Sequence, residues 1–229
     1  MRIDSLTKNT KVLSTGIKIF PDLAGAKWAE VNLDTLARED FKGDDNPLLD
    51  PQKCDVWVKA IAARLGVDYT YGGYLEDRSY LWRGHYLPKG PQAHLGIDYN
   101  VPAGTRVALL ADAEVVHIGR DGSFGGWGGL IVFRLNKPPY AGADYLYYGH
   151  LAWDDTVAVG QKLKAGAFVG RIGEPHENGV WFPHIHVQLV SERMMKLAKG
   201  NPEAVDGYMP PPVPREDFPD PHPYVIGRI

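Results

Sequence analysis

The 229-residue sequence has little of several features that mark other classes of protein. Its one cysteine, Cys54, excludes a disulfide within the chain. No run of about 18 apolar residues occurs, so no membrane-spanning helix is predicted. The net charge is −3 and no cluster of lysine and arginine stands out, so nothing indicates nucleic-acid binding. With 44% hydrophobic residues, the chain is expected to form one large domain, or one domain with additions.

Histidine and aspartate stand out in His94-Leu-Gly-Ile-Asp98 and in Pro183-His-Ile-His186. Two imidazoles and one carboxylate are a usual ligand set for a catalytic zinc ion, which keeps one position open for water. His184 and His186 lie two apart in an alternating apolar segment that is typical of a strand, so both can face one site. The spacing does not say which of these two histidines is the ligand.

His94 and Asp98 can share an ion only if the chain bends between them. On an extended strand they would lie about 13 Å apart, too far for ligand bonds of about 2 Å. Gly96 and the downstream Val101-Pro102 disfavour a helix. We therefore expect a bend at Gly96, where glycine supplies the backbone freedom.

A third segment, Tyr148-Gly-His-Leu151, contains His150. Taken alone, this histidine is equally compatible with a hydrogen-bonded core residue and with a functional one. His-x-His and His-x-x-x-Asp pairs are also, one at a time, more often surface or core pairs than metal sites. Their occurrence together, with turn-rich strand sequence between them, favours a metal site over incidental histidines in a structural β protein.

Five motifs occur in the order and spacing of one peptidase family: His94-Leu-Gly-Ile-Asp98, Val101-Pro-Ala-Gly-Thr105, Tyr148-Gly-His-Leu151, Val159-Gly-Gln-Lys-Leu-Lys-Ala-Gly166 and Pro183-His-Ile-His186. Over about two fifths of its length, the chain thus resembles the LytM/lysostaphin-type zinc metallopeptidases, which cut peptide bonds in bacterial cell walls. The resemblance implies that His94, Asp98 and His186 hold one zinc ion. It also implies that His150 and His184 are the catalytic pair, which orients or deprotonates water and stabilises the tetrahedral intermediate.

Two segments depart from the family pattern. The segment 173–183 is bulkier than the usual Gly/Ser/Thr stretch, which leaves the substrate in doubt but not the metal chemistry. Trp127, in Gly125-Gly-Trp-Gly-Gly129, has two interpretations: it stacks on substrate, or it caps the sheet edge.

Three further residues are candidates for substrate contacts. Tyr74 and Arg78 lie in the aromatic, glycine-rich segment 71–79, whose alternative interpretation is a buried connector in which Asp77 and Arg78 satisfy nearby backbone groups. Tyr86, shortly before the first zinc motif, could donate a hydrogen bond to the oxyanion.

The chain is interpreted as three parts. Residues 1–84 form an accessory region with one amphipathic helix, which starts at Asp50-Pro51 and ends at Gly66. Residues 85–191 form the zinc metallopeptidase domain, and residues 192–229 form a C-terminal proline-rich strap anchored by Tyr224-Val-Ile226.

The fold is expected to be mainly β, with an antiparallel sheet core of the lysostaphin/LytM type and a small helical part near the N-terminus. The predicted strands are 105–111, 114–119, 130–135, 145–150, 167–172 and 184–190. A short helix is predicted at 192–199.

The expected function is hydrolysis of peptide bonds in peptidoglycan or its fragments, with one zinc ion, a peptide partner and no nucleic acid. Two alternatives stay open: an inactive zinc-binding regulatory or binding module of the same fold, and an intracellular hydrolase of a related small peptide. Residues 1–20 contain no signal-peptide core. We therefore expect either a protein that stays in the cell or one whose signal was removed before this sequence begins.

Overall fold

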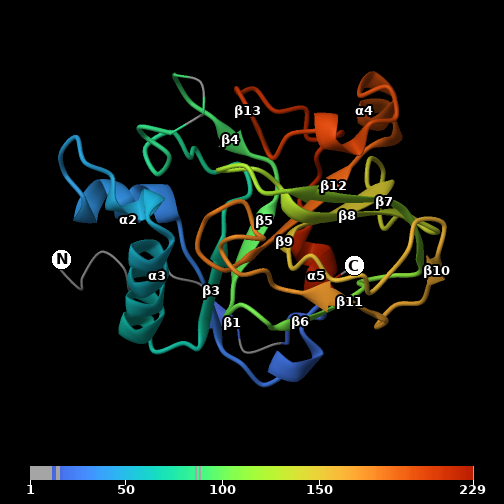
Figure 1. Cartoon of the computed structure of the whole chain (residues 1–229), viewed down its shortest axis with the longest axis horizontal. Helices are drawn as coiled ribbons and strands as arrows, with labels where there is room; N and C mark the ends of the chain where they lie inside the picture. Colours follow the sequence, from blue (N-terminus) through green and yellow to red (C-terminus); the bar gives the residue numbers. More distant parts are fainter. Residues whose placement is uncertain (1–11, 14–15, 86, 88, 229) are drawn as a thin grey trace.

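The computed structural model describes residues 12–13, 16–85, 87 and 89–228. Within these residues, nine strands form one sheet in the order β1-β2-β3-β5-β12-β9-β8-β7-β10 (Figure 1). Two small sheets, β11-β6 and β13-β4, stand beside it. The strands of the large sheet are β1 Val12–Leu13, β2 Trp28–Glu30, β3 Tyr69–Gly72, β5 Ile97–Asn100, β7 Ala113–Asp121, β8 Gly128–Leu135, β9 Tyr145–Leu151, β10 Lys162–Leu163 and β12 Ile185–Val190. The small sheets contain β4 Ala93–His94, β6 Arg106–Ala108, β11 Phe168–Arg171 and β13 Tyr208–Met209.

The pairing is antiparallel throughout the centre of the large sheet, and β2 pairs with β3 in parallel. The expectation of a mainly β protein with an antiparallel core is confirmed. The strands of residues 12–72 lie in the same sheet as those of the later sequence, because β3 pairs with β5. The first part of the chain therefore extends the sheet rather than standing apart from it.

The helices are α2 Leu33–Asp40, α3 Pro51–Leu65, α4 Glu192–Leu197 and α5 His222–Val225, with short 3-10 turns at Pro21–Leu23, Pro47–Leu49 and Pro202–Ala204. The prediction for α3 is confirmed at both ends. The Asp50 side chain accepts hydrogen bonds from the backbone of Gln52 and Lys53, and Gly66 ends the helix in the left-handed conformation.

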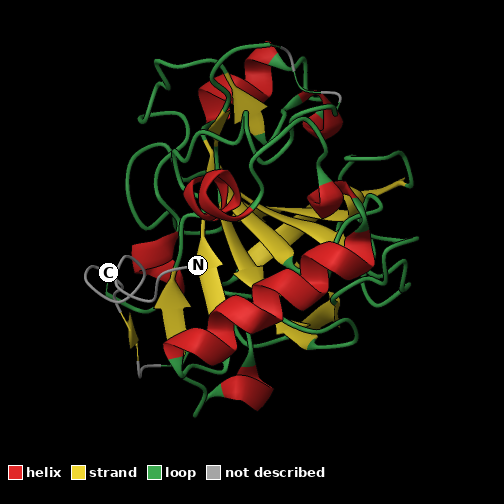
Figure 2. Cartoon of the chain, turned by 90° about the vertical axis from the view of Figure 1, so that its left-hand side faces the viewer, coloured by secondary structure: helices red, strands yellow, loops and turns green. Residues whose placement is uncertain are grey.

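The expectation of a single helix in the first 84 residues was wrong, because α2 is a second one. Asn32 caps it by accepting a hydrogen bond from the backbone N–H of Thr35. The helix buries Leu33, Leu36 and Ala37. Figure 2 shows α3 running in front of the strands, so that both helices lie on one side of the molecule.

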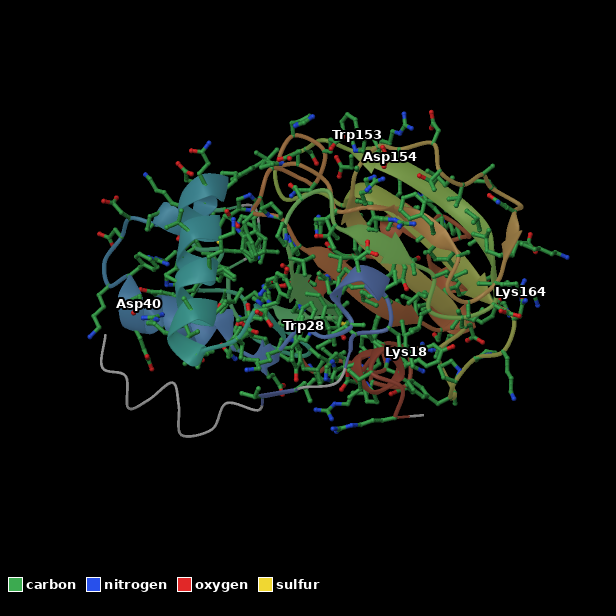
Figure 3. The ribbon with its side chains drawn as sticks, turned by 90° about the horizontal axis from the view of Figure 1, so that it is seen from below. Lys18, Trp28, Asp40, Trp153, Asp154 and Lys164 are labelled. Atoms are coloured by element: carbon green, nitrogen blue, oxygen red, sulfur yellow. The ribbon has the colours of Figure 1, made fainter. Side chains whose placement is uncertain are left out.

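Three clusters of buried side chains make up the core. The largest lies along the sheet and joins Phe20, Trp28 and Tyr71 from the early strands and turns to Tyr99 and Phe133. Trp28 lies at the middle of the molecule in Figure 3, with α2 and α3 on one side and most of the sheet on the other.

The second cluster links the helices to the loop before β12 and contains Trp57, Trp82 and Trp181. The third lies under α4 and contains Tyr147 and Met195. Each cluster combines segments that are far apart in sequence, so the described chain packs as one unit.

Helix α5 anchors the C-terminal part of the described chain to the sheet. Val225 of α5 is fully buried in the sheet core, and Tyr224 and Ile226 pack against it. Among the described residues, no helix is both long and apolar enough to cross a membrane.

Candidate active site

Three side chains converge at the centre of the large sheet. His94 Nε2 lies 2.9 Å from His186 Nδ1 and 3.4 Å from Asp98 Oδ1, and His186 Nδ1 lies 3.2 Å from the same oxygen. All three side chains are buried, and their ligand atoms lie within 4.8 Å of one another. Two ring nitrogens and one carboxylate oxygen are therefore in position to bind one metal ion.

The strand pairing explains this convergence. In the register between β12 and β5, His186 lies opposite Asp98. His94 ends β4, and the chain turns at Leu95 and Gly96 before Asp98 in β5.

The bend expected at Gly96 is present, but the reason for glycine differs from the prediction. A Cβ atom at this position would lie 2.5 Å from both His186 Nε2 and the Val187 carbonyl oxygen. The glycine is needed for the close approach of two strands beneath the site.

His150 and His184 lie beside this group, with their ring centroids 4.3 Å apart. His150 Nδ1 is 2.8 Å from the carbonyl oxygen of Asn178, and His184 Nδ1 is 2.7 Å from that of Phe182. Because a carbonyl oxygen only accepts hydrogen bonds, each Nδ1 carries the proton. Each Nε2 then keeps its lone pair and can accept a proton.

An irregularity between β8 and β9 sets the position of His150. The register shifts between Gly129 and Ile131, and His150 has a positive φ of 66°. Its backbone N–H donates to the Trp127 carbonyl oxygen over 2.8 Å. Bulges of this kind often redirect a side chain next to an active site.

The surroundings favour the neutral forms of His94, His150 and His184 and the charged form of Asp98. Burial lowers the pKa of His94 to about 4, and the nearby Asp98 only partly offsets this effect. Burial also lowers the pKa of His184, and it holds the pKa of His150 well below its ordinary value with help from the two neighbouring histidines. For Asp98, burial raises the pKa, but His94, Arg78 and hydrogen bonds outweigh it, so the pKa lies well below its ordinary value. Neutral imidazole and ionised carboxylate are the forms that bind a metal ion.

Sequence reasoning missed one supporting residue, Gln188. Its side-chain oxygen lies 2.8 Å from His186 Nε2, so this nitrogen carries the proton and Nδ1 is left facing Asp98 and His94. The Gln188 amide nitrogen donates in turn to the Asp206 carbonyl oxygen over 3.3 Å. The signal was available, because His184, His186 and Gln188 share one face of a strand.

The five residues open into a cleft of about 450 Å³. Aromatic side chains form part of its lining: Trp82, Phe124, Trp127, Trp181 and Tyr208. Acidic residues other than Asp98 also line it, namely Asp121, Glu203 and Asp206, and the lining described contains no lysine or arginine. This charge pattern favours a cation in the cleft.

The other candidates from the sequence differ in their location. Trp127 lines the cleft, and its ring centroid lies 5.2 Å from that of His186. Tyr74 lies outside the cleft lining, and its hydroxyl donates to the Phe218 carbonyl oxygen over 2.8 Å. Arg78 is fully buried below the cleft, where it contacts Asp98. Tyr86 lies outside the described residues.

Comparisons with known proteins found a matching family model and several similar solved structures. Residues 92–200 match the model of peptidase family M23. Similar solved structures include the catalytic domain of the antimicrobial peptidase lysostaphin from Staphylococcus simulans, at 23% identity over 58% of this chain and 79% of that chain, with a TM-score of 0.40. They also include a mutant catalytic domain of the prophage-encoded M23 protein EnpA from Enterococcus faecalis, at 24% identity over 47% and 73% of the two chains, with a TM-score of 0.37. LytU is a third, at 21% identity over 58% and 84%, with a TM-score of 0.36.

Proposed function

Since the chain carries a domain of peptidase family M23 at residues 92–200, we propose that it is a zinc-dependent endopeptidase. Its proposed substrates are peptide bonds in the stem or cross-bridge peptides of peptidoglycan, or in their fragments. The observation that carries the proposal is the convergence of His94 Nε2, Asp98 Oδ1 and His186 Nδ1 at the cleft.

The donor set fits zinc. Two imidazoles and one carboxylate are common at catalytic zinc sites, and such sites leave a position open toward the substrate. His186 also has the outer hydrogen bond that metal-bound histidines usually make, here to Gln188. When bound, zinc supplies a Lewis acid that polarises the scissile carbonyl and acidifies water.

The two remaining histidines would carry the proton transfers. His150 Nε2 and His184 Nε2 each hold a lone pair, because their Nδ1 atoms donate to backbone carbonyl oxygens. One of them can accept the proton of the attacking water and return it to the leaving amine. The carbonyl partners hold both rings in place, and their hydrogen bonds offset part of the lowering of the two pKa values by burial.

The cleft offers the substrate two kinds of contact. The aromatic side chains give apolar surface for a peptide, while Asp121, Glu203 and Asp206 place negative charge along its lining. The proposal therefore favours a peptide without acidic groups close to the scissile bond.

Incubation with whole peptidoglycan and with soluble muropeptides, with and without a chelator, tests the proposal. Mass spectrometry should detect products with new amino and carboxyl ends, chelation should abolish them, and added zinc should restore them. Binding without any product would contradict the peptidase proposal and favour a binding module.

Two variants separate metal binding from proton transfer. We expect His186→Ala to lose both zinc and cleavage. His150→Gln should keep zinc, measured by atomic absorption, and lose about 10²–10⁴-fold in turnover. Equal zinc content in the wild type and in His186→Ala would contradict the ligand assignment.

A further inference from the structure

The two oxygens of Asp98 have different partners. Oδ1 faces His94 and His186, whereas Oδ2 lies 3.2 Å from Nη2 of Arg78. Arg78 is 0% exposed and belongs to the segment before residues 92–200. Its position next to a predicted metal ligand was not expected from the sequence.

Other groups fix the Arg78 guanidinium in this place. Its Nε lies 3.1 Å from Glu76 Oε1, and the same oxygen accepts a hydrogen bond from the backbone N–H of Asp34 over 2.8 Å. The turn at Gly73 lies close against both Arg78 and His94, because a Cβ atom at this position would clash with Arg78 Nη2 and would lie 2.5 Å from His94 Nδ1. Arg78 therefore has little room to move away from Asp98.

The backbone ties this segment to the metal ligands as well. Leu75 donates to the His94 carbonyl oxygen over 2.8 Å, and His94 donates to the Glu76 carbonyl oxygen over 2.9 Å. Displacement of the Arg78 segment would thus displace His94.

We propose that Arg78 is a positioning residue for Asp98: it occupies Oδ2, so that the carboxylate binds the metal through Oδ1 alone. The proposal rests on the metal site of the proposed function. Arginine suits this role because its guanidinium stays charged even when it is buried, so it keeps an ion pair with Oδ2. Glu76 is the nearest partner of the Arg78 guanidinium, and burial raises the pKa of its carboxyl to about 7 although Arg78 opposes this shift.

Zinc affinity, measured by competition with a chromophoric chelator, tests the proposal without any substrate. Arg78→Lys keeps the charge but replaces the planar guanidinium with a smaller ammonium group, and the double variant Arg78→Met with Glu76→Gln removes both ionisable groups together. We expect each to bind zinc about 10–100-fold more weakly than the wild type, as is usual when an outer partner of a ligand is lost. Thermal unfolding of each variant reports whether it is folded.

Arg193→Lys is the matched control. Arg193 pairs with the buried Asp217 through both its Nε and its Nη2, away from the cleft lining. This variant should keep the wild-type zinc affinity, even if its stability falls.

The visible absorption of the cobalt-substituted protein reports on the coordination of the metal ion itself. The cobalt-substituted wild type should show the strong visible absorption of a four-coordinate ion, and Arg78→Lys should show the weaker absorption of a higher coordination number. Folded Arg78 variants with wild-type zinc affinity and an unchanged cobalt spectrum would overturn this proposal alone. A wild-type spectrum of higher coordination number would also overturn it, and a wild type that binds no zinc would overturn the proposed function as well.

Discussion

The family-matched segment and the residues that flank it contribute different things to the site. Residues 92–200 supply His94, Asp98, His150, His184 and His186. The flanking residues supply the surroundings: strands that continue the sheet, the buried Arg78, and cleft walls such as Trp82 and Tyr208. The family match therefore contains the five candidate site residues, but residues 92–200 are not a complete folded unit.

The sheet gives the physical reason. Without β3, the backbone of β5 would be an unpaired edge directly beside Asp98. Unpaired edges expose N–H and C=O groups and invite pairing with other chains. The early strands thus cover the edge of the sheet that carries the metal ligand.

The largest loss of stability is expected in the core, where side chains of the two regions pack against each other. Trp28→Ala should lower the free energy of unfolding by about 3–5 kcal/mol, the usual cost of truncating a buried tryptophan. Trp28 lies in the flank, but its ring packs against Phe20 and against Tyr99 of the matched segment. Urea unfolding followed by far-UV circular dichroism should give one transition, displaced as a whole.

Trp153→Ala is the control for this measurement. Trp153 lies in a loop, and 37% of its surface is exposed (Figure 3). Its loss should change the stability by no more than about 0.5 kcal/mol. Two separate unfolding transitions, or a small effect of Trp28→Ala, would mean that the flank folds independently.

Local signals made the helix α3 predictable. Asp50, Pro51 and Gly66 are capping residues whose effect depends only on their neighbours in sequence. The strands β7, β8, β9 and β12 were also located, because Gly, Pro and Asp-Gly separate them in the sequence. The strands β1, β4, β5, β10 and β13 and the parallel pair β2-β3 were missed, because their pairing depends on partners far along the chain.

The residues of the candidate site also differ in how well local sequence patterns predict them. Residue type and spacing singled out the histidines and Asp98, and the strand register then brings His186 opposite Asp98. Arg78 was a substrate candidate, and no local pattern indicates that it lies beneath Asp98. Its contact is set by the turn at Gly73 and by the pairing of β3 with β5, which only the folded chain provides.

A substitution at the junction between the two regions should cause a smaller loss of stability. The Trp181 indole N–H donates to the Leu48 carbonyl oxygen over 3.0 Å, and its ring lies 4.3 Å from that of Trp82. Trp181→Phe leaves this carbonyl oxygen without its donor, which should cost about 1–3 kcal/mol. Because Trp181 also lines the cleft, kcat/KM for peptide cleavage should fall too.

Trp57→Phe is a matched comparison for this junction. Trp57 also donates its indole N–H, to Asp40 at 2.8 Å, but it lies between the helices and outside the cleft lining. It should lose stability while the kcat/KM of the enzyme stays unchanged. Equal loss of kcat/KM in both variants would mean that the helical part acts on the cleft through stability alone.

The smallest effect is expected at the far end of the helical flank, at the cap of α3. The Asp50 side chain accepts hydrogen bonds from the backbone of Gln52 over 3.0 Å and Lys53 over 3.1 Å. Asp50→Ala should therefore cost about 1 kcal/mol in urea unfolding, whereas Asp55→Ala, which removes only an ion pair with Lys59 within the helix, should cost about 0.3–0.5 kcal/mol. Zinc affinity should be unchanged in both variants, because neither residue contacts the groups that hold Asp98. A fall in zinc affinity for Asp50→Ala would show that the metal site depends on the whole helical flank, and not only on the turn that carries Arg78.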